Sequence, residues 1–262
     1  MNPSLEKAEE QSKRMALAKS KVSSNNGKAP MLLPRYGDVV EDLQKANLLP
    51  AIVFVFSRVG CEQHAKMVMQ SRVTLLDSRD SNYVKAAVTN FAKAHPEIPV
   101  SRGVVQMLVA GVAVHHAGLI PVWKAFIESL FNANKIKVLF ATETLAAGVN
   151  MPARTTVIST VTKRVNSEVM KLKTSQLLQM AGRAGRRGKD VEGTVVIMRS
   201  KFEDMNLGHR ILTSPVDGIR SHFKVSYGLL VKLLETRSVE ECRLLIERGF
   251  GSYMLQKKLS KR

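Results

Sequence analysis

Five short strand-forming segments constrain the fold of this chain more than any other feature of its sequence. The first, AIVFVF at 51–56, is β-branched and aromatic with no polar alternation, which is the pattern of a strand buried on both faces. Four more follow it along the chain: GVAVHH, IKVLFAT, TTVISTV and GTVVIM. Helical patterns separate them, and such alternation predicts an α/β fold, a parallel sheet with helices on both faces.

The helical patterns differ in strength along the chain. The clearest begins with Pro121 and places Trp123, Phe126, Ile127 and Leu130 on one face, as in an amphipathic helix. Other helices are expected over 38–46, 59–70, 71–110 (broken by HPEIP) and 175–184. Beyond 199 the strands stop, and helical patterns at 223–234 and 239–247 predict a small helical region with a basic end.

The charge of the chain predicts a polyanionic partner. Among 262 residues, 40 Lys and Arg stand against 22 Asp and Glu, a net charge of +18. Nucleic acid is the most frequent partner of such proteins, and the alternatives are a soluble protein with a basic, solvated surface or a ribosome-associated protein. Residues 151–200 hold ten Lys and Arg against three acids, so the excess is concentrated around the sequence QMAGRAGRRG at 179–188.

The sequence predicts an intracellular, reducing compartment, because it shows neither a secretory signal nor a disulfide framework. Nucleus, cytoplasm and plastid are all left open. Cys61 and Cys242 lie far apart without metal-ligand spacing, which favours neither a disulfide framework nor zinc. The longest apolar run, 48–56, is too short to span a bilayer, and no membrane partner is expected. Residues 1–30 are polar and predict a flexible basic lead-in without a secretory signal.

The sequence QMAGRAGRRG is the strongest candidate for a phosphate contact. Arg183 and Arg186 are three residues apart, so on a last helical turn they would face one way. Gly182 and Gly185 would let a ligand approach the backbone. Guanidinium groups match phosphate oxygens and neutralise charge on a transferring phosphoryl group, the arginine-finger role. The alternative is a solvated cationic helix end, which the helix dipole favours.

A second polar segment, ATETLAAGVNMPA at 141–153, follows a predicted strand. Thr142 and Thr144 offer hydroxyls and backbone N–H groups to phosphate, Gly148 allows a tight turn, and Asn150 presents an amide. The alternative is an ordinary strand–helix junction with Thr142 as the cap. Because ligands bind beyond the carboxyl ends of parallel strands, we expect this segment, FSRVG at 56–60 and QMAGRAGRRG to form one composite surface.

Two further candidates stand beside predicted strands. His115 and His116 are adjacent, so on a strand they point to opposite faces, and without a third ligand nearby no metal site is expected. His116 fits either a phosphate or sugar contact or a buried, hydrogen-bonded imidazole. Arg58 fits either a phosphate contact or a surface salt bridge.

The sequence contains no P-loop. Its Gly-Lys pairs, Gly27-Lys28 and Gly188-Lys189, are followed by Ala and Asp instead of Ser or Thr. There is also no Asp-Glu pair for Mg²⁺, no HExxH and no nucleophile–base signature. The chain therefore has arginines suited to bind phosphate but no motif that would hold a nucleotide. Alone it is expected to be inactive.

Four stretches resemble the second RecA-like lobe of superfamily 2 helicases, in particular the Ski2-like DExH group. FVFSR resembles motif IV, GVAVHHAGL that group's His-His-Ala-Gly-Leu segment, VLFATETLAAGVNMPA motif V and QMAGRAGRRGKD motif VI. Their order and spacing agree over about 40–200. The tail is similar to the start of the winged-helix region, which implies three parts: lead-in 1–30, RecA-like lobe 31–205 and helical or winged-helix-like region 206–262. TKRVNSEVMKLK at 162–173 departs from the family pattern.

The resemblance implies roles for the candidate residues. Arg183 and Arg186 would reach the γ-phosphate of ATP, which a first lobe missing from this sequence would hold with Mg²⁺. Gln179 would couple that site to the strand, and Gly148 and Asn150 would lie near the nucleotide. The phosphate backbone of a tracked RNA strand would contact Arg58, His116, Thr142 and Thr144. Such motors typically move 3′ to 5′.

Three functional hypotheses remain open at this point. The first is one lobe of an ATP-dependent RNA helicase, whose partners are single-stranded or partly duplex RNA and the first lobe. The second is a non-catalytic RNA-binding module derived from such a lobe. The third is a docking protein, which gives no reason for the paired arginines.

Overall fold

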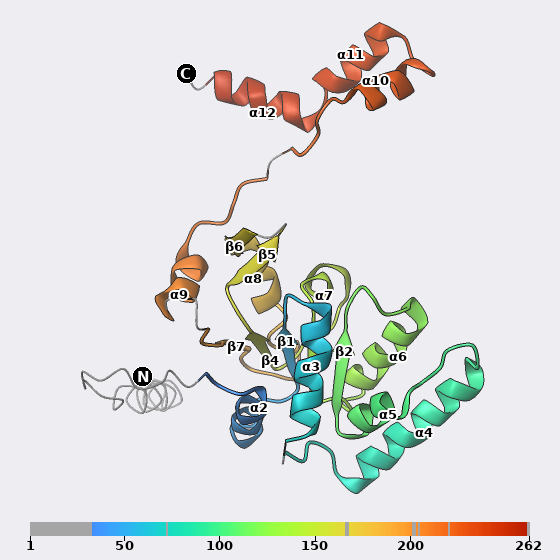
Figure 1. Cartoon of the computed structure of the whole chain (residues 1–262). Helices are drawn as coiled ribbons and strands as arrows, with labels where there is room; N and C mark the ends of the chain where they lie inside the picture. The colour runs from blue at the N-terminus through green and yellow to red at the C-terminus, as the bar shows by residue number, and fades with distance from the viewer. Residues whose placement is uncertain are drawn as a thin grey trace.

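The core of the molecule is a five-stranded parallel sheet with strand order β2-β3-β1-β4-β7 (Figure 1). The computed structural model describes residues 33–71, 73–165, 168–200, 203, 205–219 and 221–260, so the predicted lead-in lies outside the described residues. The strands are β1 Ala51–Phe54, β2 Val112–His115, β3 Val138–Ala141, β4 Thr155–Ile158 and β7 Thr194–Ile197. All five predicted strands are present, and the α/β fold is confirmed.

Each central strand is apolar throughout because it contributes to two cores. On β1, Ile52 and Phe54 belong to one buried cluster, and Ala51 and Val53 belong to the other. All four β1 residues are at most 1% exposed. Successive side chains of a strand point to opposite faces, so two covered faces leave no position for a polar residue.

Helices cover both faces of the sheet. Two helices, α2 Tyr36–Lys45 and α3 Arg58–Met69, contribute buried residues to one cluster. The opposite cluster receives α4 Ser78–Ala94, α6 Pro121–Asn132, α7 Thr144–Gly148 and α8 Thr174–Ala181, while α5 Arg102–Val109 contributes to both. The prediction of helix from 71 onward is wrong for 73–77, because Asp77 caps α4 by accepting a hydrogen bond from the N–H of Asp80.

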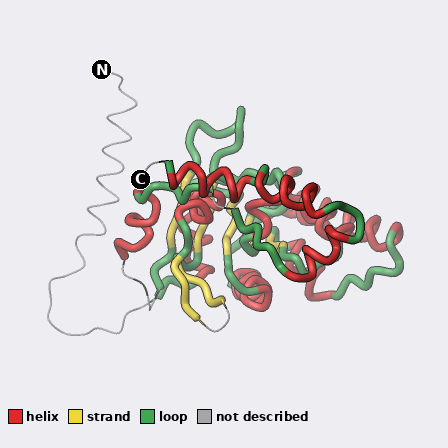
Figure 2. The backbone as a smooth tube through the Cα atoms, turned by 90° about the horizontal axis from the view of Figure 1, so that it is seen from above, coloured by secondary structure: helices red, strands yellow, loops and turns green. Residues whose placement is uncertain are grey.

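The sequence did not predict the antiparallel hairpin of β5 Thr162–Val165 and β6 Glu168–Lys171. It projects from the end of the sheet beside α8, and Figure 2 shows it as a separate pair of strands. All of β6 is exposed. The hairpin lacks the apolar run of a buried strand because its two strands pair only with each other.

From 205 onward the described residues form four helices joined by loops, and none of these residues is in a strand. Helix α9 Met205–Thr213, beyond the predicted boundary at 205, packs on α8, and its Ile211 is in the core. Helices α10 Tyr227–Leu234, α11 Val239–Glu247 and α12 Phe250–Leu259 lie apart from the sheet (Figure 1). None of the helices in the described ranges is long and apolar enough to cross a membrane.

Candidate functional site

The predicted site residues lie at two opposite edges of the sheet. We call the edge where the parallel strands begin the amino edge, and the edge where they end the carboxyl edge. The expectation of one composite surface is wrong, because α8 runs back from the carboxyl edge and delivers the loop 182–190 to the amino edge. There Ala184 pairs with Ala153, just before β4 begins.

The carboxyl edge gathers the predicted nucleic-acid contacts. Arg58 is the exposed first residue of α3, directly after β1, and Ser57 caps that helix. A Cβ on Gly118 would lie 3.2 Å from Nδ1 of His116 and 3.5 Å from Cδ of Arg58, which shows how close these residues are. Thr142 donates its backbone N–H to the carbonyl of His115, at 3.2 Å, and so joins the same edge.

The hydroxyls at this edge face one another. Oγ1 of Thr142 and Oγ1 of Thr144 are 2.9 Å apart. Thr142 is half-buried and Thr144 is exposed. Thr142 is not the cap of α7, because Glu143 occupies that position without a side-chain hydrogen bond. The two hydroxyls are therefore available together to an approaching ligand.

His116 is a buried, neutral imidazole with an unused nitrogen. Its Nδ1 accepts the N–H of Gly118 at 3.2 Å, so the proton is assigned to Nε2. Nε2 lies 3.6 Å from a carboxylate oxygen of Glu62 and has no hydrogen-bond partner in the described structure. Burial lowers the pKa of His116, which favours the neutral form. Nε2 is itself buried, so in this conformation it is not open to a ligand.

His115 points elsewhere, as adjacent strand residues must. Its Nε2 lies 2.8 Å from Oε1 of Glu128 on α6. Within the described ranges, no three His, Cys, Asp or Glu side chains are grouped so that they could hold a metal ion.

The amino edge holds Arg186 and Asn150. Both line a surface pocket with Arg187, Lys189 and Pro152. The prediction that Arg183 and Arg186 share a helical turn is wrong, because α8 ends at Ala181 and both arginines lie in the following loop.

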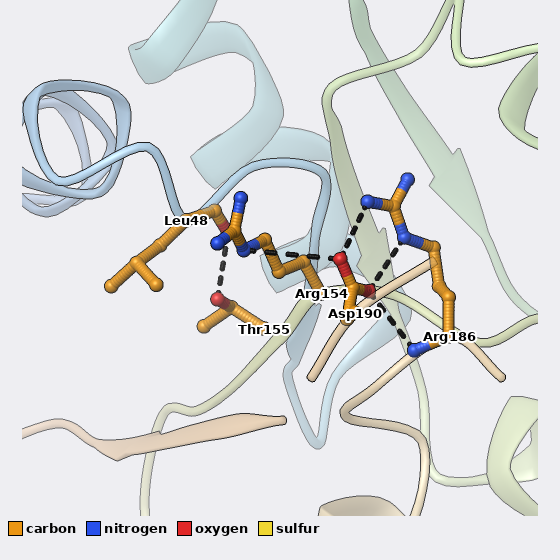
Figure 3. Close-up of polar contacts among 5 residues, drawn as sticks. All are labelled: Leu48, Arg154, Thr155, Arg186 and Asp190. Carbon is orange, nitrogen blue, oxygen red and sulfur yellow. Dashed lines mark hydrogen bonds and ion pairs between the residues drawn. The ribbon is translucent and has the colours of Figure 1, made fainter. Parts of the chain in front are cut away.

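Asp190 fixes the position of Arg186 (Figure 3). Its carboxylate accepts hydrogen bonds from N and Nε of Arg186 at 3.0 and 2.7 Å through Oδ2, and from Nη2 at 2.8 Å through Oδ1. Arg154 approaches the same carboxylate at 3.9 Å. The Asp190 side chain is 3% exposed, and its bonds to Arg186 lower its pKa to about 2. In the described residues Nη1 of Arg186 has no partner, so one arm of the guanidinium remains for a ligand.

Arg183 contacts α7 instead. Its Nε donates to the carbonyl of Ala146 at 3.1 Å, and its Nη2 donates to the same oxygen. Its own carbonyl accepts the N–H of Ala153 at 2.8 Å. Arg183 thus joins the loop 182–190 to the segment 144–153, and in this conformation its guanidinium is bound to the protein.

The glycines have different roles. Gly185 has φ +92° and lies against Gly193, where a Cβ would be 2.5 Å from the carbonyl carbon of Ala184. This close approach requires Gly193. Gly148, expected at a tight turn, is the exposed last residue of α7 with open space around it, so the turn does not require it. Gln179 is exposed on α8.

The chain is similar in sequence to several known proteins. Residues 106–188 match the helicase conserved C-terminal domain. The chain is 39% identical over 241 residues to the chloroplastic DExH-box ATP-dependent RNA helicase DExH15 of Arabidopsis thaliana. It is 35% identical over 217 residues to the antiviral helicase SKI2 of Saccharomyces cerevisiae, and 33% over 232 residues to superkiller complex protein 2 of Homo sapiens. These alignments include 85%, 78% and 85% of this chain.

The chain belongs to the Ski2-like DExH helicases and contains their C-terminal RecA-like lobe. It spans 16–20% of the length of these three relatives. The domain match includes His116, Thr142, Asn150 and Arg186 but ends before Asp190.

Four residues that organise this Ski2-like lobe were not predicted. Asp190 holds Arg186, and Arg154 lies 3.9 Å from the same carboxylate. Glu143 and Lys163 form an ion pair with distances of 2.7 and 2.9 Å that ties the hairpin to α7. Asp190 lies four residues after Arg186 and closes QMAGRAGRRGKD, which was the available signal. The sequence holds no comparable signal for the pair Glu143–Lys163, because it depends on the unpredicted hairpin.

Proposed function

We propose that the chain is the second motor lobe of an ATP-dependent RNA helicase. In this proposal Arg186 acts as an arginine finger toward ATP that a first lobe holds with Mg²⁺, and the carboxyl edge grips the RNA backbone during 3′ to 5′ translocation. Family membership supports the helicase assignment, whereas the finger, the direction and the first lobe belong to the proposal.

The observation that carries the proposal is the state of Arg186. Its side chain is 22% exposed, and its guanidinium is oriented by a buried carboxylate. Nη1 has no partner in the described residues. A phosphoryl group that approaches the amino edge would therefore meet a charged fork whose orientation is already fixed, which is what electrostatic catalysis needs.

Arg183 has a different role in this proposal. Because its guanidinium binds the carbonyl of Ala146, it positions α7 relative to Arg186 until ATP draws it away. Helix α7 carries Thr144 at the carboxyl edge and leads to Asn150 at the amino edge. A shift of this element upon ATP binding would reach the RNA contacts.

The RNA side rests on Arg58, His116, Thr142 and Thr144. Arg58 makes no ion pair with any described residue, so the salt-bridge alternative has no partner in the described structure. Two kinds of donor thus face the same edge, a guanidinium and two hydroxyls, and the buried imidazole of His116 lies beside Arg58. These groups recognise phosphate and sugar without reading base sequence.

The test begins with the chain alone. We expect no ATP hydrolysis above buffer, with single-stranded RNA binding that weakens steeply as salt rises. A chimera in which this chain replaces the aligned segment of the Arabidopsis relative, with its P-loop lobe retained, should hydrolyse ATP faster when RNA is present.

Hydrolysis by the chain alone would show that it holds ATP by itself and would overturn the proposal. A chimera that folds and binds RNA, but whose hydrolysis does not respond to RNA, would favour the non-catalytic RNA-binding module.

A further inference from the structure

A second pocket lies at the amino edge, on the other side of Arg186. It is lined by Lys137, Arg154, Arg186, Gln44, Asn47 and Asn134, among others. Asn47 and Asn134 have φ of 56° and 60°, in turns that lead toward β1 and β3, and asparagine tolerates this conformation well. The pocket shares Pro50, Asn134 and Arg186 with the one that contains Asn150.

Lys137 is the unusual residue of this pocket. It is half-buried and forms no ion pair with any described carboxylate. Burial is the main reason that the pKa of its ammonium is lowered. The charges of Asp80 and Asp77 oppose this shift, and those of Lys135 and Arg186 add to it. The nearby Asp80 is already bound to Lys135, at 2.5 Å. A partly desolvated cation without an ion-pair partner of its own among the described residues is unfavourable, and a bound anion would relieve it.

The residues around the pocket also carry a net positive charge. Lys137, Arg154 and Arg186 bring three positive charges, and Asp190, which accepts from Arg186 and lies 3.9 Å from Arg154, supplies one negative charge. The carboxamides of Asn47 and Asn134 supply N–H donors beside these cations. The pocket therefore offers an excess of positive charge and several hydrogen-bond donors.

We propose that Lys137, Arg154 and Arg186 form a phosphate-binding pocket at the amino edge. The phosphate comes either from the end of a nucleoside triphosphate or from inorganic phosphate that hydrolysis releases. The pocket is a separate subsite from that of Asn150, and Arg186 stands between the two. Its assignment to nucleotide chemistry rests on the proposed function, whereas phosphate binding itself does not.

An RNA backbone is a poorer fit to this pocket. The donors suited to a continuous strand lie at the carboxyl edge, whereas these cations meet in a recess at the start of β1, β3 and β4. A recess takes a terminal phosphate group more readily than a chain that must pass through.

The experiment uses the chain alone and nuclear magnetic resonance of the arginine side-chain N–H groups. Inorganic phosphate, tripolyphosphate and ATP without Mg²⁺ are titrated at constant ionic strength. Phosphate should shift the Nε–H signals of Arg154 and Arg186. Lys137→Met should weaken binding by about tenfold, the loss of one charge-assisted hydrogen bond, and Lys137→Arg should restore most of it.

The matched control is Lys66→Met, which removes an exposed lysine on α3 and should leave the affinity unchanged. The proposal would be overturned if Lys66→Met weakened phosphate binding as much as Lys137→Met does. It would also be overturned if no probe shifted the signals of Arg154 and Arg186. Tighter binding of ATP than of inorganic phosphate would identify the nucleotide as the source, and equal affinity would identify free phosphate. Because no hydrolysis is involved, this result is independent of the chimera's activity.

Discussion

The two edges of one sheet differ in how their polar groups are held. At the amino edge Arg186 is fixed by a nearly completely buried carboxylate, with Arg154 as a second cation. At the carboxyl edge Arg58 is exposed, and Nε2 of His116 has no partner in the described structure. A group that must meet a phosphoryl at one point benefits from rigid orientation. A surface that holds and releases a moving strand benefits from looser donors.

Arg186→Ala in the chimera should have the largest effect of the substitutions proposed. If it left ATP hydrolysis unchanged, the two edges would not differ in role as described above. An arginine finger contributes about 10³-fold or more to turnover, so we expect RNA-stimulated hydrolysis to fall by about that factor. RNA affinity, measured by fluorescence anisotropy, should change less than about twofold because Arg186 lies at the other edge. Turnover within about threefold of the unmodified chimera would remove Arg186 from catalysis.

Asp190→Asn should have the next largest effect, because it removes the carboxylate that holds Arg186. We expect the free energy of unfolding to fall by about 2 kcal/mol, measured by chemical denaturation. The pKa of Asp190 is lowered to about 2, so its contribution is fully present above about pH 4 and is lost as pH falls toward 2. The variant should therefore lose less stability over this range than the unmodified chain, and equal losses would contradict the ion pair's role.

Arg58→Ala should produce a smaller change, confined to the carboxyl edge. We expect RNA affinity to fall by about fivefold. The slope of log affinity against log salt concentration should decrease in magnitude by about one. Arg102→Ala is the matched control, because Arg102 is also an exposed first residue of a Ser-capped helix. Equal losses from both variants would indicate general attraction of RNA to a basic protein.

Lys163→Met should have the smallest effect. It removes the ion pair between the hairpin and Glu143 on α7, whose carboxylate is 41% exposed, so the pair is worth about 0.5 kcal/mol or less after solvent screening. We expect RNA stimulation of the chimera to fall by about twofold with stability unchanged. A larger loss would make the hairpin a principal link between the edges.

The sequence predicted the sheet well because burial on both faces leaves an unmistakable apolar pattern at Ala51–Phe54 and its neighbours. It failed for the hairpin, whose strands carry charged side chains and whose β6 is exposed throughout. It also placed the arginine loop at the wrong edge, because residue types in a loop do not reveal on which edge that loop emerges. The topology does: a helix between parallel strands runs back to the edge where the next strand begins, as α8 does before β7.

Amide hydrogen exchange of the chain with and without single-stranded RNA tests most directly whether the two edges bind different ligands. We predict slower exchange with RNA in peptides that include Arg58, His116 and Thr142–Thr144, and unchanged exchange in the loop 183–190. Protection concentrated in that loop, with none at the carboxyl edge, would contradict the account.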